Sequence, residues 1–111
     1  MSSAMILSGS CLCGAVRYRI AGDLVTSVNC HCSMCRKAHG AAFRSGAIVK
    51  AQEFSWTQGE EQVTDYRSSE HMHRMFCRTC GSHMVARSDT HPGIEITDPL
   101  PQFPVVPPPP R

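Results

Sequence analysis

Apolar and polar residues alternate in short segments along most of this chain. Between residues 14 and 20, three apolar side chains alternate with Arg17 and Arg19, which is typical of a half-buried strand. No segment has an apolar stripe with helical spacing over three turns. Short strands at this spacing predict an all-β domain, with further strands at 43–49, 62–67, 72–76 and 83–86.

Two places in the chain need an interpretation beyond this strand pattern. Residues 36–42 have room for one helical turn or an ordered loop, because Gly40 interrupts them. His71 and His73 have strand spacing, with Met72 on the opposite face. We interpret these two histidines as exposed strand residues rather than as a third metal site.

The two ends of the chain differ from the patterned region. Residues 1–8 form a short lead-in, and the domain is expected to span 9–96. The segment 97–111 contains seven of the eight prolines, and its polyproline run cannot join a sheet. We interpret it as a proline-rich, solvated tail; a ligand for a proline-binding module is the alternative.

Size and charge narrow the class of protein. A chain of 111 residues holds one core. Its formal charge of +2, without a run of basic residues, argues against a nucleic-acid partner. No stretch approaches the roughly 18 apolar residues that span a bilayer, and residues 1–10 lack the basic start of a signal peptide. We therefore expect a cytoplasmic protein with no membrane partner.

Seven cysteines are the main chemical feature, and they fall into three clusters. In a reducing compartment, an odd number of closely spaced cysteines favours metal binding over disulfides, which would leave one thiol over. Thiolate pairs that are far apart in the chain favour zinc over an iron–sulfur cluster. Seven divides into four plus three, which predicts two Zn²⁺ ions as cofactors.

The first and last clusters are predicted to share one structural zinc. Cys11 and Cys13 have strand spacing, so both thiolates can reach one ion. Cys77 and Cys80 have the spacing of a zinc knuckle, and Gly81 relieves the turn that follows. A metal held by all four cysteines would clamp the start of the domain to its end.

The middle cluster offers three thiolates, from Cys30, Cys32 and Cys35. Three protein ligands leave the fourth position of a zinc ion open to water or an incoming thiol. A thiol bound there is deprotonated at neutral pH and can attack an aldehyde carbon. Two alternatives stay open: pairing of this cluster with another, which leaves spare thiols, or closure of the site by a histidine, namely His31, His39 or His83.

The residues after this cluster have two interpretations each. Arg36 and Lys37 can hold the carboxylates of a peptide-like thiol, or they can form a solvated face. Gly40 and Phe43 can shape a loop around the open metal position, or they can be a turn residue and a core residue. We take Arg36, Lys37 and Gly40 as candidate substrate-binding residues.

Three segments together resemble the glutathione-dependent formaldehyde-activating (GFA) family, which also includes centromere protein V. They are GSCLCGAV at 9–16, CHCSMCRKAHG at 30–40 and FCRTCGS at 76–82. Their order, spacing and flanking residues agree with the family over roughly residues 9–86. The resemblance implies a fold of short, twisted β-sheets stapled by zinc.

The resemblance also implies roles for the cysteines. Cys11, Cys13, Cys77 and Cys80 match the structural zinc ligands, and the middle cluster matches the site where glutathione meets the second metal. The implied activity joins glutathione to formaldehyde and, in the reverse direction, is that of a carbon–sulfur lyase. The expected partners are thus a small-molecule thiol and an aldehyde. The alternatives are a non-catalytic zinc scaffold, or thiol-redox or metal-buffering work by the three-cysteine cluster.

The chain departs from the family after the last cysteine pair. Residues 88–93 resemble the start of the family's C-terminal region and residues 94–104 resemble its end, while the middle is missing. Missing strands would expose sheet edges and part of the core. We therefore expect a shortened member of the family, with its metal sites kept and its substrate enclosure reduced.

Overall fold

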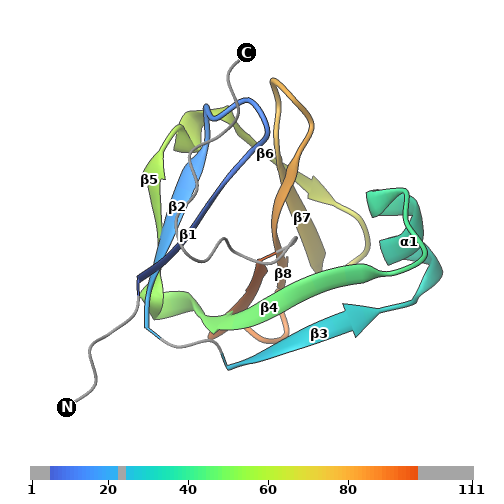
Figure 1. Ribbon diagram of the computed structural model, residues 1–111. Helices are drawn as coiled ribbons and strands as arrows, with labels where there is room; N and C mark the ends of the chain where they lie inside the picture. The colour runs from blue at the N-terminus through green and yellow to red at the C-terminus, as the bar shows by residue number, and fades with distance from the viewer. Residues whose placement is uncertain (1–5, 23–24, 98–111) are drawn as a thin grey trace.

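Two antiparallel β-sheets make up the part of the chain that the computed structural model describes, residues 6–22 and 25–97 (Figure 1). The smaller sheet contains, in spatial order, β1 (Ile6–Ser10), β2 (Arg17–Ala21) and β5 (Phe54–Gln58). The larger sheet contains β3 (Thr26–Cys30), β4 (Arg44–Lys50), β9 (Ile94–Thr97), β8 (His83–Ser88), β7 (Met72–Cys77) and β6 (Val63–Arg67). The prediction of an all-β class is confirmed.

Every strand that the alternation predicts is present, with ends shifted by a few residues. Four further strands were not predicted: β1, β3, β5 and β9. β1 begins at Ile6, before the predicted start of the domain at residue 9, and Thr97 of the predicted tail closes β9. The proline-rich residues from 98 onward lie outside the described part of the chain.

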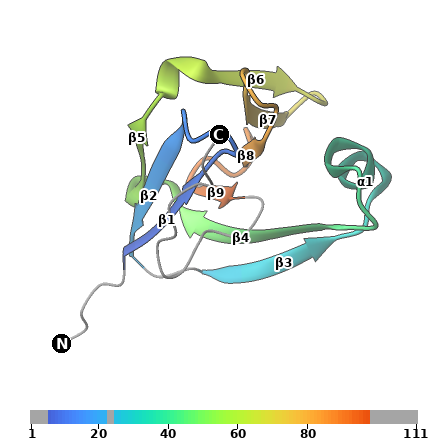
Figure 2. The same ribbon diagram turned by 45° about the horizontal axis from the view of Figure 1, so that its top comes forward.

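One short helix interrupts the strands. α1 (Ser33–His39) follows β3 after His31 and Cys32 and ends at Gly40, whose φ of 59° is left-handed. That conformation suits glycine, so the predicted break at this residue has a clear physical reason. The helix lies at the end of the β3–β4 hairpin that is farthest from the smaller sheet (Figures 1 and 2). Two 3₁₀ turns, η1 (Ala51–Glu53) and η2 (Glu60–Gln62), flank β5.

The core fills the space between the two sheets. Tyr18 of β2 stacks on Phe54 and meets Trp56 edge to face, with ring centroids 5.0 and 6.3 Å away. Such aromatic pairs add about 0.5–1.5 kcal/mol to the free energy of burial. Aliphatic side chains complete the cluster, and two cysteines belong to it, Cys11 and Cys77. Two of the candidate metal ligands are therefore part of the hydrophobic core.

Gly59 lets β5 approach the loop between β1 and β2. A Cβ atom at this position would collide with the carbonyl oxygen of Ala15, and the φ of 74° is itself left-handed. The neighbouring Gln58 side chain donates hydrogen bonds to the carbonyls of Gly14 and Ala15, at 3.1 and 3.3 Å. These contacts hold the backbone that carries Cys11 and Cys13.

The segment after the last cysteine pair completes the larger sheet. β9 pairs with β4 on one side and with β8 on the other. It therefore has no open edge, and the edge strands of this sheet are β3 and β6. Residues 89–93 alone connect β8 to β9. That a longer family region is missing here stays a prediction, but the strands that are present form a continuous sheet.

His73 is buried, so the interpretation of this residue as exposed is wrong; only 9% of it is accessible, whereas His71 is exposed as predicted. The His73 ring bridges two carboxylates: Nδ1 lies 3.0 Å from Asp65 Oδ1, and Nε2 lies 3.0 Å from Asp89 Oδ1. The hydrogen bond from His73, together with the charge of Arg67, lowers the pKa of Asp89. His73 thereby ties β6 and the β8–β9 turn to β7.

No helix within the described residues is both long and apolar enough to cross a membrane.

Replacement of His73 by alanine tests this bridge. We expect His73→Ala to lower the free energy of unfolding by about 1–3 kcal/mol, because two hydrogen bonds to carboxylates are lost. His71→Ala is the matched control; its exposed ion pair with Glu70 should contribute less than about 1 kcal/mol. Urea denaturation followed by circular dichroism measures both, and equal effects would contradict the bridge.

Candidate metal centres

The four-cysteine group lies where the two sheets meet. Cys11 and Cys13 sit in the loop between β1 and β2, whereas Cys77 ends β7 and Cys80 lies in the turn before β8. All four sulfur atoms lie within 4.8 Å of one another. The Cys11–Cys13 and Cys13–Cys77 sulfur distances are 3.5 and 3.9 Å, close to the separation of about 3.8 Å that tetrahedral Zn²⁺–thiolate geometry requires.

Backbone hydrogen bonds shape both loops of this group. The amide of Gly81 (φ 80°) donates to the Cys77 carbonyl at 2.8 Å, which closes the knuckle between the last two cysteines. The amide of Leu12 donates to the Ser82 hydroxyl at 2.9 Å and so joins the two loops directly. The amide of Val16 also donates to the Cys11 sulfur at 3.3 Å. The loops are thus arranged around the sulfur atoms by main-chain contacts.

The Cys80 thiol favours its ionised form. Burial raises its pKa, but hydrogen bonds from the Ser82 side chain and backbone, with others from Cys13 and Cys77, lower the pKa to about 6. The Cys80 sulfur lies 3.2 Å from the Ser82 hydroxyl. A stabilised thiolate is the form that binds metal, so the donor set fits a closed structural Zn²⁺ site.

The three-cysteine group lies at the junction of β3 and α1. Cys30 ends β3, Cys32 precedes the helix, and Cys35 lies within its first turn. Their sulfur atoms also lie within 4.8 Å of one another. Cys35 is buried and Cys32 is exposed, so the group is accessible from one side. All seven cysteines are free, which argues against the disulfide alternative.

No histidine or carboxylate among the described residues joins the three-cysteine group. The ring of His31 instead lies 5.0 Å from that of Phe43, and the ring of His39 lies 4.3 Å from that of His83. The alternative of a fourth, histidine ligand therefore has no support in this geometry. The donor set fits Zn²⁺ with one position left for an external ligand.

The thiol pKa values of Cys30 and Cys35 shift in opposite directions. A backbone hydrogen bond from Cys32 and a side-chain bond with Cys35 lower the pKa of Cys30 to about 7, and the charge of Arg44 acts in the same direction. Burial raises the pKa of Cys35, against hydrogen bonding from Arg74. The Arg74 Nη2 atom lies 3.7 Å from the Cys35 sulfur.

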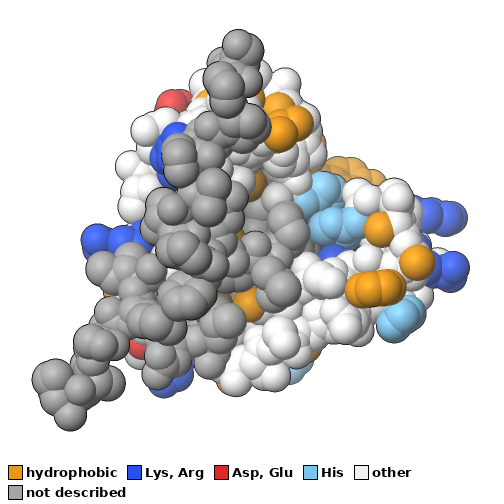
Figure 3. All heavy atoms as spheres, viewed as in Figure 1, with side chains coloured by type: hydrophobic (Ala, Val, Ile, Leu, Met, Phe, Trp, Pro, Cys, Tyr) orange, Lys and Arg blue, Asp and Glu red, His pale blue; other side chains and the backbone are white. Residues whose placement is uncertain are grey.

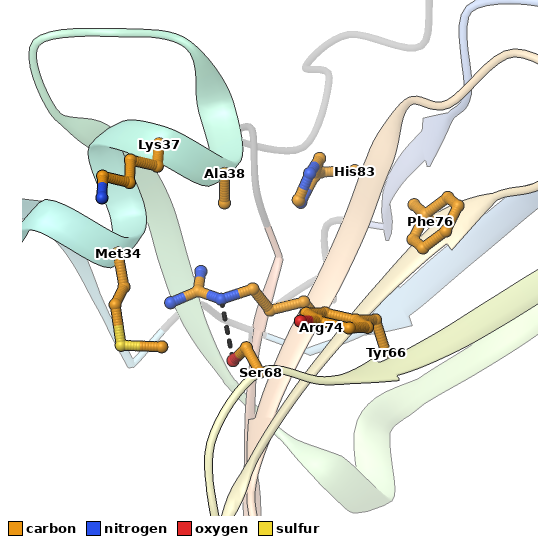
Figure 4. Close-up of a pocket in the computed structure, with 8 residues that line it drawn as sticks. All are labelled: Met34, Lys37, Ala38, Tyr66, Ser68, Arg74, Phe76 and His83. Atoms are coloured by element: carbon orange, nitrogen blue, oxygen red, sulfur yellow. Dashed lines mark hydrogen bonds between the residues drawn. The ribbon is translucent and has the colours of Figure 1, made fainter.

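Two hollows lie beside α1. The first, about 340 Å³, opens between the helix and the larger sheet (Figure 4) and is lined by Met34, Lys37, Ala38, Tyr66, Ser68, Arg74, Phe76 and His83. The second, about 410 Å³, is lined by Ser33, Arg36, Lys37, Gly40, Ala41 and Ala42. Histidine, basic and hydrophobic side chains gather at this end of the molecule (Figure 3).

The structure thus places the three candidate substrate-binding residues, Arg36, Lys37 and Gly40, around one hollow, and Lys37 borders both. Phe43 is exposed and contacts His31 rather than the core. Sequence reasoning missed Arg74, which is buried beside Cys35. An arginine in an alternating strand is expected to face solvent, and only the pairing of β7 between β6 and β8 reveals the burial.

Residues 6–98 match the protein family described as "Glutathione-dependent formaldehyde-activating enzyme". The chain belongs to this family. Proteins of Halomonas elongata and Fusarium vanettenii, both named "Putative glutathione-dependent formaldehyde-activating enzyme", are 32% identical over 84 residues and 28% identical over 83 residues. These matches cover 70% and 74% of this chain.

The GFA chain described here spans about half the length of those relatives, 54% and 45%. The crystal structure of a Rhodobacter sphaeroides protein has the same fold, with a TM-score of 0.70 and 25% identity. That match covers 83% of this chain and 84% of the other, so these two chains have similar lengths. The fold therefore also exists in a chain of this size.

Serine substitutions should separate the two cysteine groups. We expect Cys77→Ser to lower the free energy of unfolding by at least about 5 kcal/mol, because a structural zinc site contributes roughly 10–16 kcal/mol of binding free energy in small domains. Cys32→Ser, at an exposed position, should still unfold cooperatively with the four-cysteine metal in place. Guanidinium denaturation of both variants, followed by near-UV circular dichroism, is the measurement. A stable, cooperatively folded Cys77→Ser protein would exclude a clamping role.

Proposed function

We propose that this GFA protein joins glutathione or a related thiol to a small aldehyde such as formaldehyde, or cleaves the adduct in reverse as a carbon–sulfur lyase. The observation that carries the proposal is the three-cysteine group, which has three close sulfur atoms and no fourth ligand among the described residues. The names of the curated relatives support the same reaction class.

The reaction needs little from the protein beyond positioning. The thiol sulfur forms a bond to the aldehyde carbon, the carbonyl π bond breaks, and the thiol proton ends on the aldehyde oxygen. Cys30, Cys32 and Cys35 would hold a zinc ion, which as a Lewis acid would stabilise the thiol sulfur as thiolate. The exposed side of Cys32 leaves a route by which aldehyde and water reach the sulfur.

The rest of the thiol cosubstrate is proposed to lie along α1. The hollow of about 340 Å³ is within the usual range of roughly 300–1,000 Å³ for small-ligand pockets. Its apolar walls come from Met34, Tyr66 and Phe76, and Lys37 lies at the border with the second hollow. We assign Lys37, with Arg36 and Gly40 beside it, to the carboxylate end of the thiol.

The first test measures zinc and activity in one variant. We expect the wild-type protein to hold two zinc ions per chain, and Cys32→Ser to hold one, because the second metal loses a ligand. Its acceleration of thiol–formaldehyde exchange, followed by NMR with ¹³C-formaldehyde, should disappear. Ser55→Ala, an exposed change on β5, is the control.

Full activity of Cys32→Ser would refute the mechanism. A wild-type protein that holds both zinc ions without accelerating the exchange would favour the non-catalytic scaffold.

A second test uses the only two lysines of the chain, Lys37 and Lys50. Lys37→Ala should raise KM for glutathione about two- to fivefold, as expected for the loss of one exposed ion pair. The KM for 2-mercaptoethanol, which has no carboxylate, should not change. Lys50→Ala is the matched control. Equal changes for both thiols would remove Lys37 from carboxylate recognition.

A further inference from the structure

Arg74 is a buried charged residue that borders the three-cysteine group. It lies in β7, and only 5% of it is exposed. A guanidinium remains charged in proteins and carries donors on all three of its nitrogen atoms. A buried donor that has no acceptor destabilises the folded protein, so the partner of each nitrogen needs to be identified.

Two of the three nitrogens have partners. The Nε atom donates to the Ser68 hydroxyl at 3.1 Å, and the Nη2 atom donates to the Cys35 sulfur at 3.7 Å. These contacts connect β7 to the residue after β6 and to α1. The Nη1 atom is buried, and nothing within residues 6–22 and 25–97 accepts a hydrogen bond from it. Anchoring of the strand therefore accounts for Nε and Nη2 but not for Nη1.

The preceding residue shows that burial in β7 does not by itself leave donors unpaired. His73 is 9% exposed, and its two ring nitrogens each lie 3.0 Å from a carboxylate oxygen, one of Asp65 and one of Asp89. Successive residues of a strand point to opposite faces of the sheet. The unpaired donor therefore belongs to the face of β7 that carries Arg74.

That face borders a hollow. Arg74 lines the hollow of about 340 Å³ between α1 and the larger sheet. Figure 4 shows the guanidinium extending from its strand toward α1, with Met34 and Ala38 across from it. Met34 is 41% exposed, and its unbranched side chain can turn aside without a change in the backbone. A ligand in the hollow can therefore reach the guanidinium.

The position of Arg74 indicates which part of a ligand it would meet. The guanidinium is a rigid fork, so Nη1 lies at the same end of the side chain as Nη2, which contacts the Cys35 sulfur. A thiol bound at the three-cysteine group would therefore present to Nη1 the atoms closest to its own sulfur. In a cysteinyl peptide, the amide carbonyl is the nearest acceptor, separated from the sulfur by two carbon atoms.

A neutral carbonyl suits this place better than a carboxylate. The three sulfur atoms lie within 4.8 Å of one another, and as thiolates they would repel a further anion beside them. A hydrogen bond from a charged donor to a neutral carbonyl is still stronger than one between two neutral groups. Lys37, which also borders the second hollow, stays the proposed partner of a carboxylate farther from the sulfur.

We propose that Arg74 determines specificity for the thiol: its Nη1 donates a hydrogen bond to the amide carbonyl beside the thiol, so the site prefers cysteinyl peptides to simple alkanethiols. This inference rests on the proposed function, because it assumes that a thiol binds at the three-cysteine group. It extends that function by naming the class of thiol and the residue that selects it.

The experiment uses the full chain loaded with Co²⁺, whose sulfur-to-metal absorption bands change when a thiol binds. Three thiols with the same carbon chain are titrated: 3-mercaptopropionamide carries the amide carbonyl, 3-mercaptopropionate carries a carboxylate, and 1-propanethiol carries neither. Each Kd is corrected for the acidity of the thiol. We expect the wild type to bind the amide about tenfold more tightly than 1-propanethiol, and Arg74→Met to reduce this ratio below about twofold. Arg19→Met, an exposed change of the same charge on β2, should keep the wild-type ratio.

The outcomes separate this inference from the proposed function. If no thiol changes the absorption of the wild type, the open position is wrong, and the role of Arg74 is wrong with it. If the wild type binds all three thiols equally well, the open position stands and Arg74 does not determine specificity. Tighter binding of 3-mercaptopropionate than of the amide would exclude the carbonyl as the acceptor.

The absorption of the four-cysteine site verifies folding in each sample. Should Arg74→Met lose that absorption, Arg74→Gln, whose side chain ends short of the Nη1 position, carries the same expectation. A folded variant that keeps the tenfold preference for the amide would overturn the role of Arg74.

Discussion

The contact between two hairpin loops is the constraint on which the rest of the molecule depends. The β1–β2 loop and the β7–β8 turn come from different sheets, and they bring four sulfur atoms within 4.8 Å of one another. Cys11 and Cys77 are at the same time members of the apolar core. A small domain with few aromatic side chains would gain much from a metal cross-link at this point, because its apolar burial alone leaves a narrow margin of stability.

This constraint is compatible with the chemistry proposed for the three-cysteine group. The sheets are held together at one end of the molecule, so the β3–α1 junction at the other end is free to remain open (Figures 1 and 2). Its three sulfur atoms sit on a strand end and a short helix, which fix their positions while leaving Cys32 exposed. In the proposed function, stability and reactivity would thus belong to separate cysteine groups of the same chain.

The sequence predicts the cysteine grouping well because ligand spacing is local. Cys30, Cys32 and Cys35 lie within one short segment, and the two separated pairs each have a recognisable spacing. The sequence does not predict that Arg74 and His73 are buried, because their burial depends on neighbours from other strands. It also misses β9, because the alternation of Ile94 and Ile96 with Glu95 and Thr97 extends over only four residues; this short strand pairs with β4 on one side and β8 on the other. Tertiary pairing, rather than local propensity, decides these features.

The interior position of β9 has a consequence for how the chain acquires its structure during synthesis. β4 and β8 cannot be joined until residues 94–97 have left the ribosome, although both strands are made earlier. Until then each presents an unpaired edge to solvent or to a chaperone. Among the strands of residues 6–22 and 25–97, the one made last therefore completes the larger sheet, and formation of this sheet is governed by contacts between distant parts of the sequence.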